Sequence, residues 1–199
     1  MTNATSNGHF GIGVYAMSNA TVTVNNNVIA SGTNSYGINV IGTGTAVTVG
    51  GHVTATFGEG VLVVDNANAT VKGNVTGDIF GVHAVNASIT VNGDVKSTIS
   101  SGAGVLVISG SNITIDGAII TSFTYIRLGG TDKTQGDYEP ASSKTGYLEY
   151  TDNDSRGACT ASPASPYITA LPQKTMQRQV MPYRYPDAAH ISSSRVPGR

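Results

Sequence analysis

A tandem repeat runs from residue 11 to about residue 128 of this chain of 199 residues. One block of the repeat has the pattern Gly-apolar-x-apolar, and a second block follows it with the pattern apolar-x-apolar-x-(Gly/Asn)-x-apolar. The glycines that begin the first block are 24, 23, 21 and 23 residues apart: Gly13, Gly37, Gly60, Gly81 and Gly104. A period of this length indicates stacked supersecondary units that pack only against their neighbours.

Within each period, apolar residues alternate with polar or small ones. This alternation predicts β-strands, because successive side chains of a strand point to opposite faces. The inward-facing pairs of the first copy are Val14/Ala16, Val22/Val24 and Val28/Ala30. Three short strands per period of 21–24 residues predict an all-β fold, a parallel β-solenoid of about five coils. Equivalent residues of neighbouring coils then stack ~4.8 Å apart in columns.

Two columns of the repeat contain only asparagine and glycine, the residues that most readily adopt a left-handed backbone conformation. One column precedes the middle strand and contains Asn19, Gly44, Asn66, Asn86 and Gly110. The other follows that strand and contains Asn26, Gly51, Gly73, Gly93 and Gly117. We therefore predict that each coil turns two corners with left-handed residues. The third connection varies in length, which predicts variable loops along one edge.

The composition changes near residue 130. Only Lys72, Lys96 and Arg127 are basic before that point, and every proline follows it. We divide the chain into a β-solenoid repeat domain (1–130), a connector (131–155) and an irregular Pro/Arg-rich C-terminal tail (156–199). The tail is predicted to be disordered, because it has little apolar surface to offset the entropy of ordering. The composition of this tail also permits another hypothesis, that residues 156–199 are not the native continuation of the repeat but, for example, the product of out-of-frame translation.

Charge and cysteine content narrow the classes of partner. Charged residues make up 12% of the chain, about half of the usual ~25%, and the formal net charge is -1. These values give no electrostatic reason to expect nucleic acid, and no apolar run approaches the ~18 residues of a membrane span. A single cysteine, Cys159, excludes an internal disulfide, and His9 and His52 have no metal-ligand spacing, so no metal site is predicted. The repeat is already in progress at Phe10 without a signal peptide, and we expect a fragment of a longer polypeptide.

The two strand blocks, from about Gly11 to Leu128, resemble the right-handed parallel β-helix repeats of the pectate-lyase-like superfold. The resemblance is to repeat regions of bacterial cell-surface and adhesin-like proteins in particular. Segments 125–130 and 146–152 are similar to connectors that follow such repeats in Gram-positive surface proteins. The resemblance implies right-handed coils and an extracellular or cell-surface location. Members include polysaccharide lyases, glycoside hydrolases, tailspikes, adhesins and passive stalks, so the fold alone does not select a function.

An enzyme of this superfold implies clustered acidic calcium ligands near a basic residue, or two facing carboxylates. The best polar cluster of the solenoid combines Lys72, Asp94 and Asp116, with asparagines and His52 at the same corner. These three residues are the candidate catalytic groups of a carbohydrate-active enzyme, a polysaccharide lyase or glycoside hydrolase with calcium as its cofactor. The interpretation we favour is a solvated corner, with no catalytic residue and no cofactor.

The outward column of the first strand supplies the candidate ligand-binding residues. It contains Tyr15, Asn39, Leu62, His83 and Leu106. An aromatic ring with apolar neighbours suits a sugar ring or a partner surface, and a cover formed by the C-terminal segment or by loops is an equal alternative. A threonine column runs along the middle strand, but its neighbouring column is irregular, which argues against ice binding: Thr21, Ala46, Asn68, Ser88 and Asn112.

The sequence therefore predicts a structural or adhesive segment of a secreted or surface-attached bacterial protein, more consistent with a binding role than with catalysis. Stacked coils would hold outward side chains in a rigid ladder, where weak contacts to a glycan or a host or cell-surface protein add by multivalency. A carbohydrate-active enzyme is the competing hypothesis.

Overall fold

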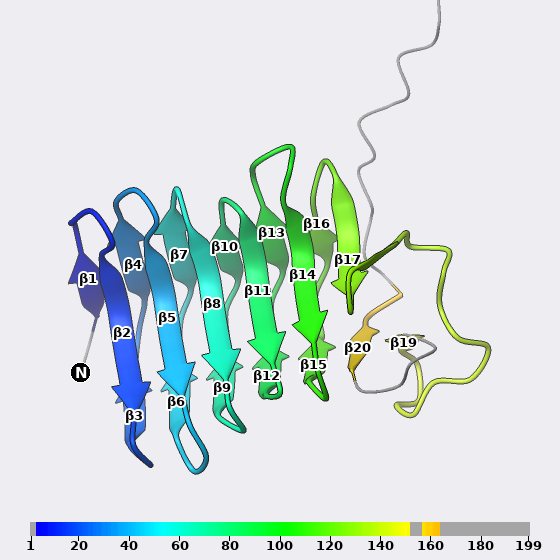
Figure 1. Cartoon of the computed structure of the whole chain (residues 1–199), viewed down its shortest axis with the longest axis horizontal. Coiled ribbons are helices and arrows are strands. Elements are labelled where there is room, and N and C mark those ends of the chain that lie inside the picture. Colours follow the sequence, from blue (N-terminus) through cyan, green and yellow to red (C-terminus); the bar gives the residue numbers. More distant parts are fainter. Residues whose placement is uncertain (1–2, 152–156, 164–199) are drawn as a thin grey trace, which may run out of the picture.

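The computed structural model describes residues 3–151 and 157–163, and every regular element in these ranges is a β-strand (Figure 1). Sheet A contains β1 (Ala4–Ser6), β4 (Val28–Ser31), β7 (Val53–Thr56), β10 (Val75–Gly77), β13 (Val95–Ser97) and β16 (Ile119–Ile120). Sheet B contains β2 (Ile12–Met17), β5 (Tyr36–Ile41), β8 (Glu59–Val64), β11 (Phe80–Val85), β14 (Ala103–Ile108), β17 (Thr124–Leu128) and β18 (Thr131–Lys133). Sheet C contains β3 (Thr21–Val24), β6 (Ala46–Val49), β9 (Asn68–Val71), β12 (Ser88–Val91), β15 (Asn112–Ile115), β20 (Ala158–Ala161) and β19 (Leu148–Thr151).

The chain visits sheets B, C and A in turn and forms a right-handed parallel β-solenoid of about five coils, as predicted (Figure 1). In Figure 1 it descends along the front in sheet B, returns behind and advances from left to right. From β1 to β14, each strand pairs in parallel with the strand three elements further along the chain. Along sheet B, Val14 pairs with Ile38, Ile38 with Val61, Val61 with Val82, and Val82 with Val105. This register reproduces the predicted spacings of 24, 23, 21 and 23 residues.

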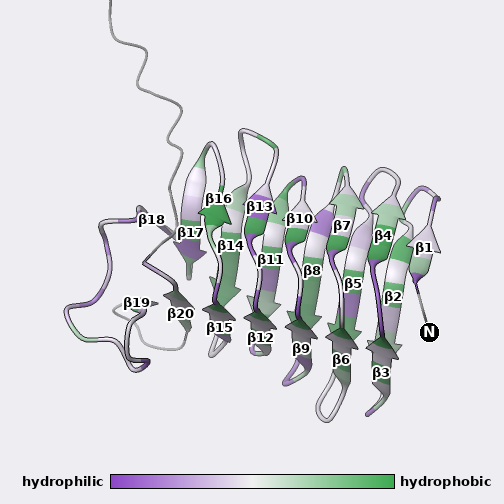
Figure 2. Ribbon diagram, turned by 180° about the vertical axis from the view of Figure 1, so that it is seen from behind, coloured by the Kyte–Doolittle hydropathy of each residue, from purple (hydrophilic) through white to green (hydrophobic). Residues whose placement is uncertain are grey.

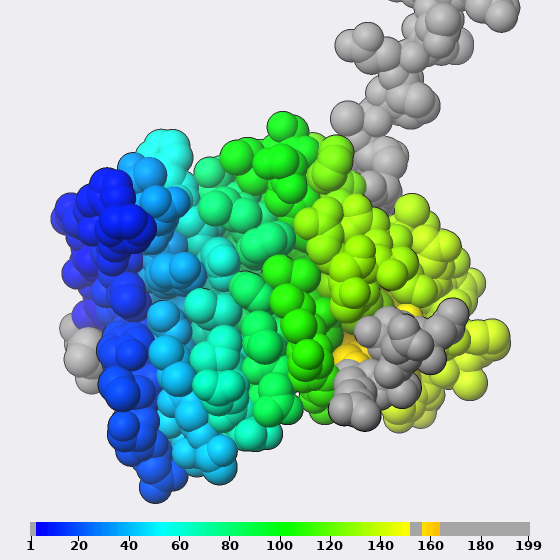
Figure 3. All heavy atoms as spheres, viewed as in Figure 1, coloured from blue at the N-terminus to red at the C-terminus, as the bar shows by residue number. Residues whose placement is uncertain are grey.

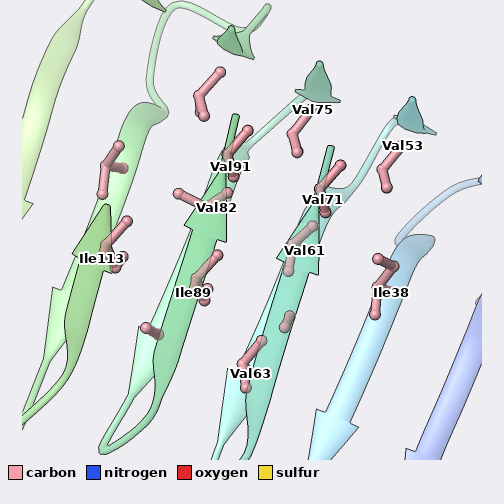
Figure 4. Packing of buried hydrophobic residues seen from close by; sticks show 14 of the residues in the cluster. Ile38, Val53, Val61, Val63, Val71, Val75, Val82, Ile89, Val91 and Ile113 are labelled. Carbon is pink, nitrogen blue, oxygen red and sulfur yellow. The ribbon is translucent and has the colours of Figure 1, made fainter. Parts of the chain in front are cut away.

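The interior is filled by columns of valine, isoleucine and alanine, contributed by all three sheets (Figure 4). Of the predicted inward residues, Val24, Val28 and Ala30 are fully buried, whereas Val22 is partly buried at the end of the stack. Because each column continues from coil to coil, every coil depends on the apolar residues of its neighbours. The short connections between sheets C and A are hydrophilic (Figure 2).

The glycines that begin the first block are required by a close approach between sheets. A Cβ atom added to Gly60 would lie 2.4 Å from the carbonyl oxygen of Gly81 and 2.5 Å from Cγ1 of Val75. The equivalent contact recurs in the other coils, in which a sheet A valine or isoleucine occupies the same space beside Gly13, Gly37, Gly81 and Gly104. The glycine column therefore makes room for the apolar column of sheet A.

The two Asn/Gly columns differ in their physical cause. The column before the middle strand has a left-handed backbone throughout, as predicted, with φ of 63° at Asn19 and 60° at Asn66. The prediction is wrong for the column after it, since none of its residues has a positive φ. Glycine is needed there because the neighbouring coil is too close: a Cβ on Gly117 would lie 2.4 Å from the carbonyl carbon of Gly93.

Two antiparallel strands end the parallel stack. β18 folds back on β17, and β19 pairs antiparallel with β20, which itself continues sheet C by pairing in parallel with β15. Tyr125 and Tyr150 are fully buried beneath these strands, with their rings edge to face at 5.8 Å. The antiparallel strands interrupt the parallel stack in sheets B and C and lie over the end of the core, and we call them the cap.

The sequence predicts no strand in the connector or the tail, yet the connector contains β18 and β19, and residues 158–161 of the tail form β20. Cys159 is completely buried in β20, and this burial raises the pKa of its thiol. The disorder predicted for the tail otherwise falls on residue 156 and residues 164–199, which lie outside the described residues. No helix in the described part of the chain is long and apolar enough to cross a membrane.

The close approach at the glycine column predicts the effect of adding one methyl group. Gly60→Ala should lower the free energy of unfolding by about 2 kcal/mol, because overpacking forces a backbone or valine shift. Gly8→Ala is the control, since an added Cβ there meets nothing within 4 Å. Urea denaturation followed by circular dichroism measures both changes, and equal midpoints for the two variants would contradict this explanation of the column.

Candidate functional site

The outward face of sheet B brings the candidate ligand-binding residues together as one column. Register pairs align Tyr15 with Asn39, Asn39 with Leu62, Leu62 with His83, and His83 with Leu106. The exposed fraction falls along the column, from 51% at Tyr15 to 8% at Leu106. Figure 3 views this face from the front, with successive coils as adjacent bands of colour. The two ends of the column therefore differ: the first coil offers an exposed aromatic ring, whereas Leu106 is mostly covered.

A second apolar column lies beside the first and was missed from sequence. It occupies the last position of each sheet B strand, where the side chains are partly or well exposed: Met17, Ile41, Val64, Val85 and Ile108. The signal for it was present, because each of these residues lies two positions after a member of the first column and one position after the second inward residue of its strand. It widens the face from a single row of side chains to an apolar band across five coils.

Two polar groups interrupt the sheet B face and interact with their neighbours. Nδ1 of His83 lies 3.0 Å from Oε2 of Glu59, and the ring of His83 meets the ring of Phe80 edge to face at 5.5 Å. Among the described residues, Nε2 of His83 and Oδ1 of Asn39 are buried without a hydrogen-bond partner. His83 is thus held by a carboxylate and an aromatic ring, an arrangement that fixes a side chain within a surface.

The proposed catalytic corner contains a hydrogen-bonded ladder between coils. The N–H of His52 donates to Oδ1 of Asn27 at 2.8 Å, and the N–H of Asn74 donates to Nδ1 of His52 at 2.9 Å. The ladder continues with the N–H of Asp94 to Oδ1 of Asn74 at 2.9 Å and the N–H of Ala118 to Oδ1 of Asp94 at 2.8 Å. The carboxylate of Asp94 therefore accepts a hydrogen bond from a backbone N–H of the next coil, as the side chains of Asn27 and Asn74 do at the same corner.

Asp116 anchors the cap to the solenoid. Its carboxylate accepts hydrogen bonds from the hydroxyl of Tyr147 at 2.6 Å, from Nδ2 of Asn92 at 2.6 Å and from Nζ of Lys144 at 3.0 Å. The bond from Tyr147 is the largest cause of the lowered pKa of Asp116. Burial is the next largest effect and opposes it, and the bonds from Asn92 and Lys144 lower the pKa further. Nζ of Lys144 also lies 3.6 Å from the ring centroid of Tyr147.

Lys72 lies one coil before Asn92 in the Asp116 column, and it is exposed. It forms no ion pair with any described residue. Both candidate carboxylates are thus occupied by donors of the protein itself, Asp94 by a backbone amide and Asp116 by the cap. Within residues 3–151 and 157–163, no three His, Cys, Asp or Glu side chains gather in a way that would hold a metal ion, calcium included.

The variable loops between sheets A and B carry exposed apolar side chains that the sequence analysis did not single out. Phe10 and Phe57 are 64% and 61% exposed, and their backbones are left-handed, with φ of 58° and 65°. A bulky residue rarely adopts this conformation, at a cost of about 1–2 kcal/mol. Inter-coil hydrogen bonds hold both loops: the N–H of Phe10 donates to the carbonyl of Thr33, and the N–H of Asn34 donates to that of Phe57.

Comparisons of the chain with protein-family models, with curated proteins and with solved structures give no match. The parallel β-solenoid is therefore established by the strand register, and its relation to any superfold member stays a resemblance.

The lowered pKa of Asp116 predicts how acid acts on the capped structure. Because its folded pKa lies below the unfolded value of ~3.9, its contribution is present above that value and is lost as pH falls through the folded pKa. Asp116→Asn should therefore cost about 1 kcal/mol near pH 6 and progressively less as the pH falls below about 3.9.

Urea denaturation of wild type and variant across this pH range measures the difference. Asp65→Asn is the control, since Asp65 is exposed and its left-handed backbone suits asparagine. A gap between Asp116→Asn and wild type that persists unchanged at acid pH would contradict the anchoring role.

Proposed function

We propose that this chain is a structural and adhesive segment of a secreted or surface-attached bacterial protein. The observation that carries the proposal is the outward face of sheet B, where the column from Tyr15 to Leu106 and the apolar column from Met17 to Ile108 run side by side across five coils. The ring of Tyr15 is exposed at one end of this face. Exposed apolar patches of this kind mark interaction surfaces in soluble proteins. The partner is a glycan or a host or cell-surface protein.

The physical basis of binding is repetition on a rigid support. Coil spacing places neighbouring members of a column ~4.8 Å apart, so an extended partner meets the same kind of contact at each step. Each contact is weak, but contacts held in fixed positions add without further ordering cost. The partly buried contact between Nδ1 of His83 and the carboxylate of Glu59 keeps the middle of the face in one arrangement.

Catalysis is the less favoured function. The carboxylate of Asp94 accepts a hydrogen bond from a backbone amide, and that of Asp116 accepts one from Tyr147. Lys72 lies at the same corner without an ion pair to any described residue. A hydrolase or lyase needs carboxylates directed at a substrate rather than at the protein. The bonds of these two carboxylates support a structural role.

The adhesive function predicts the effect of polar substitutions on the sheet B face. Tyr15→Asn combined with Leu62→Asn should fold normally, because asparagine already occupies this column at Asn39. Retention on immobilised glycans and extracellular-matrix proteins should fall about tenfold, the equivalent of 1.4 kcal/mol. The matched control is Thr48→Asn with Thr70→Asn on the outward face of sheet C, which should bind as wild type.

Two results would count against this function. One is equal retention of the sheet B pair and the wild type on every surface that the wild type binds. The other is release of shorter saccharides from any tested glycan by wild type but not by Asp94→Ala, since turnover of that kind identifies an enzyme.

A further inference from the structure

The turn between sheets B and C is one residue shorter in the fourth coil than in its neighbours. Residues 65–67 join β8 to β9 and residues 109–111 join β14 to β15, but only residues 86 and 87 join β11 to β12. The three turns lie side by side along the lower edge of Figure 1. The short turn leaves a hollow of about 220 Å³ between its longer neighbours, which we call the notch.

The lining of the notch is polar and uncharged. Asn66 and Asn86 contribute carboxamides from the turns, while Asn68, Ser88 and Asn112 contribute polar groups from the first residues of β9, β12 and β15. Register pairs place Asn68 beside Ser88, and Ser88 beside Asn112. Four asparagines and one serine from three successive coils therefore line one hollow.

These carboxamides are not used by the protein. Within the described residues, no side-chain hydrogen bond involves Asn66, Asn68, Asn86 or Asn112. The contrast is with the next corner, where Asn27, Asn74 and Asn92 are committed to bonds between coils. The polar groups of the notch keep their full capacity to donate and accept, since each carboxamide has two N–H donors and one carbonyl acceptor.

The backbone of the notch is fixed in place. Asn66 and Asn86 have left-handed φ values of 60° and 48°. The N–H of Asn66 donates to the carbonyl of Asn86 at 2.6 Å, and the N–H of Asn86 donates to that of Ile108 at 3.1 Å. Ala67 and Ala87 are buried beneath the turns. Pre-organised polar groups of this kind bind at a lower entropic cost than groups on a mobile loop.

We propose that the notch binds an uncharged, hydroxyl-rich ligand, namely one ring of a neutral saccharide. Hydroxyl groups both donate and accept hydrogen bonds, which matches carboxamides and a serine hydroxyl. No cationic side chain lines the notch, and the exposed carboxylate of Asp65 precedes Asn66 in the same turn, so an acidic saccharide is disfavoured. The volume lies below the ~300 Å³ of an ordinary small-molecule pocket, which fits a single ring. The inference deepens the proposed adhesive function and rests on it.

The test uses substitutions already present in the same columns of the repeat. Asn68→Ala and Asn112→Ala place alanine where Ala46 stands in the second coil, and Asn86→Gly places glycine where Gly44 stands. The triple variant should therefore fold as wild type while losing three carboxamides. The control is Asn25→Gly with Asn26→Gly, which removes two exposed carboxamides from another corner. Glycine already occupies the equivalent positions of the next coil, at Gly50 and Gly51.

The whole chain, labelled with ¹⁵N, is titrated with short cello-, manno- and malto-oligosaccharides, and with oligogalacturonates as acidic probes, up to ~10 mM. We expect at least one neutral oligosaccharide to shift the side-chain NH₂ resonances of Asn66, Asn68, Asn86 and Asn112, with a Kd of about 1 mM. The triple variant should bind at least tenfold more weakly, and the control variant should bind as wild type.

Three results would overturn the notch as a saccharide site: no shift of these resonances with any neutral probe, preference for oligogalacturonates, or unchanged binding by the triple variant. The retention assay on immobilised glycans and matrix proteins distinguishes failure of the notch proposal from failure of the proposed adhesive function. Retention lost by the Tyr15/Leu62 pair but kept by the triple variant overturns only the notch, whereas retention kept by both variants overturns both proposals.

Discussion

Parallel hydrogen bonding between successive coils determines which residues each position of the repeat can hold. It fixes neighbouring coils ~4.8 Å apart, so each residue stacks on its equivalent in the next coil. Inward columns must then be apolar and compatible in size, and Val61, Val82 and Val105 meet this condition. The same spacing brings backbones so close at Gly60 and Gly117 that no side chain fits. Low charge follows, because interior and corner positions together exclude most ionisable residues.

The periodic part of the fold was predictable from sequence, because the same pattern of apolar, polar and glycine residues recurs in five successive coils. The register in sheet B and the left-handed column that includes Asn19 and Asn66 agree with the prediction. The column with Gly117 was misassigned, because glycine has two uses, conformational freedom and close approach, and composition does not distinguish them. Only the distance to the Gly93 backbone shows which use applies.

The cap and the polar corner were less predictable, because their partners are distant in sequence and occur once. β20 has no periodic signal and is a strand because β15 offers an unpaired edge. Asp116 looked like half of a catalytic pair, yet its carboxylate meets Tyr147 and Lys144 of the connector. The outward residues of sheet B were located correctly as a column, since a column needs only the period. The notch depends on a one-residue difference between turns, which becomes meaningful only when neighbouring coils are superimposed in space.

The parallel register of successive coils can be measured by nuclear Overhauser contacts across sheet B in the ¹³C-methyl-labelled chain. We expect methyl contacts between Val61 and Val82 and between Val82 and Val105. The amide of Val75 should be slow to exchange, because it donates to the carbonyl of Asp94. Contacts that pair β8 with β9 as an antiparallel hairpin, or that shift the Val61 partner by one residue, would contradict this register.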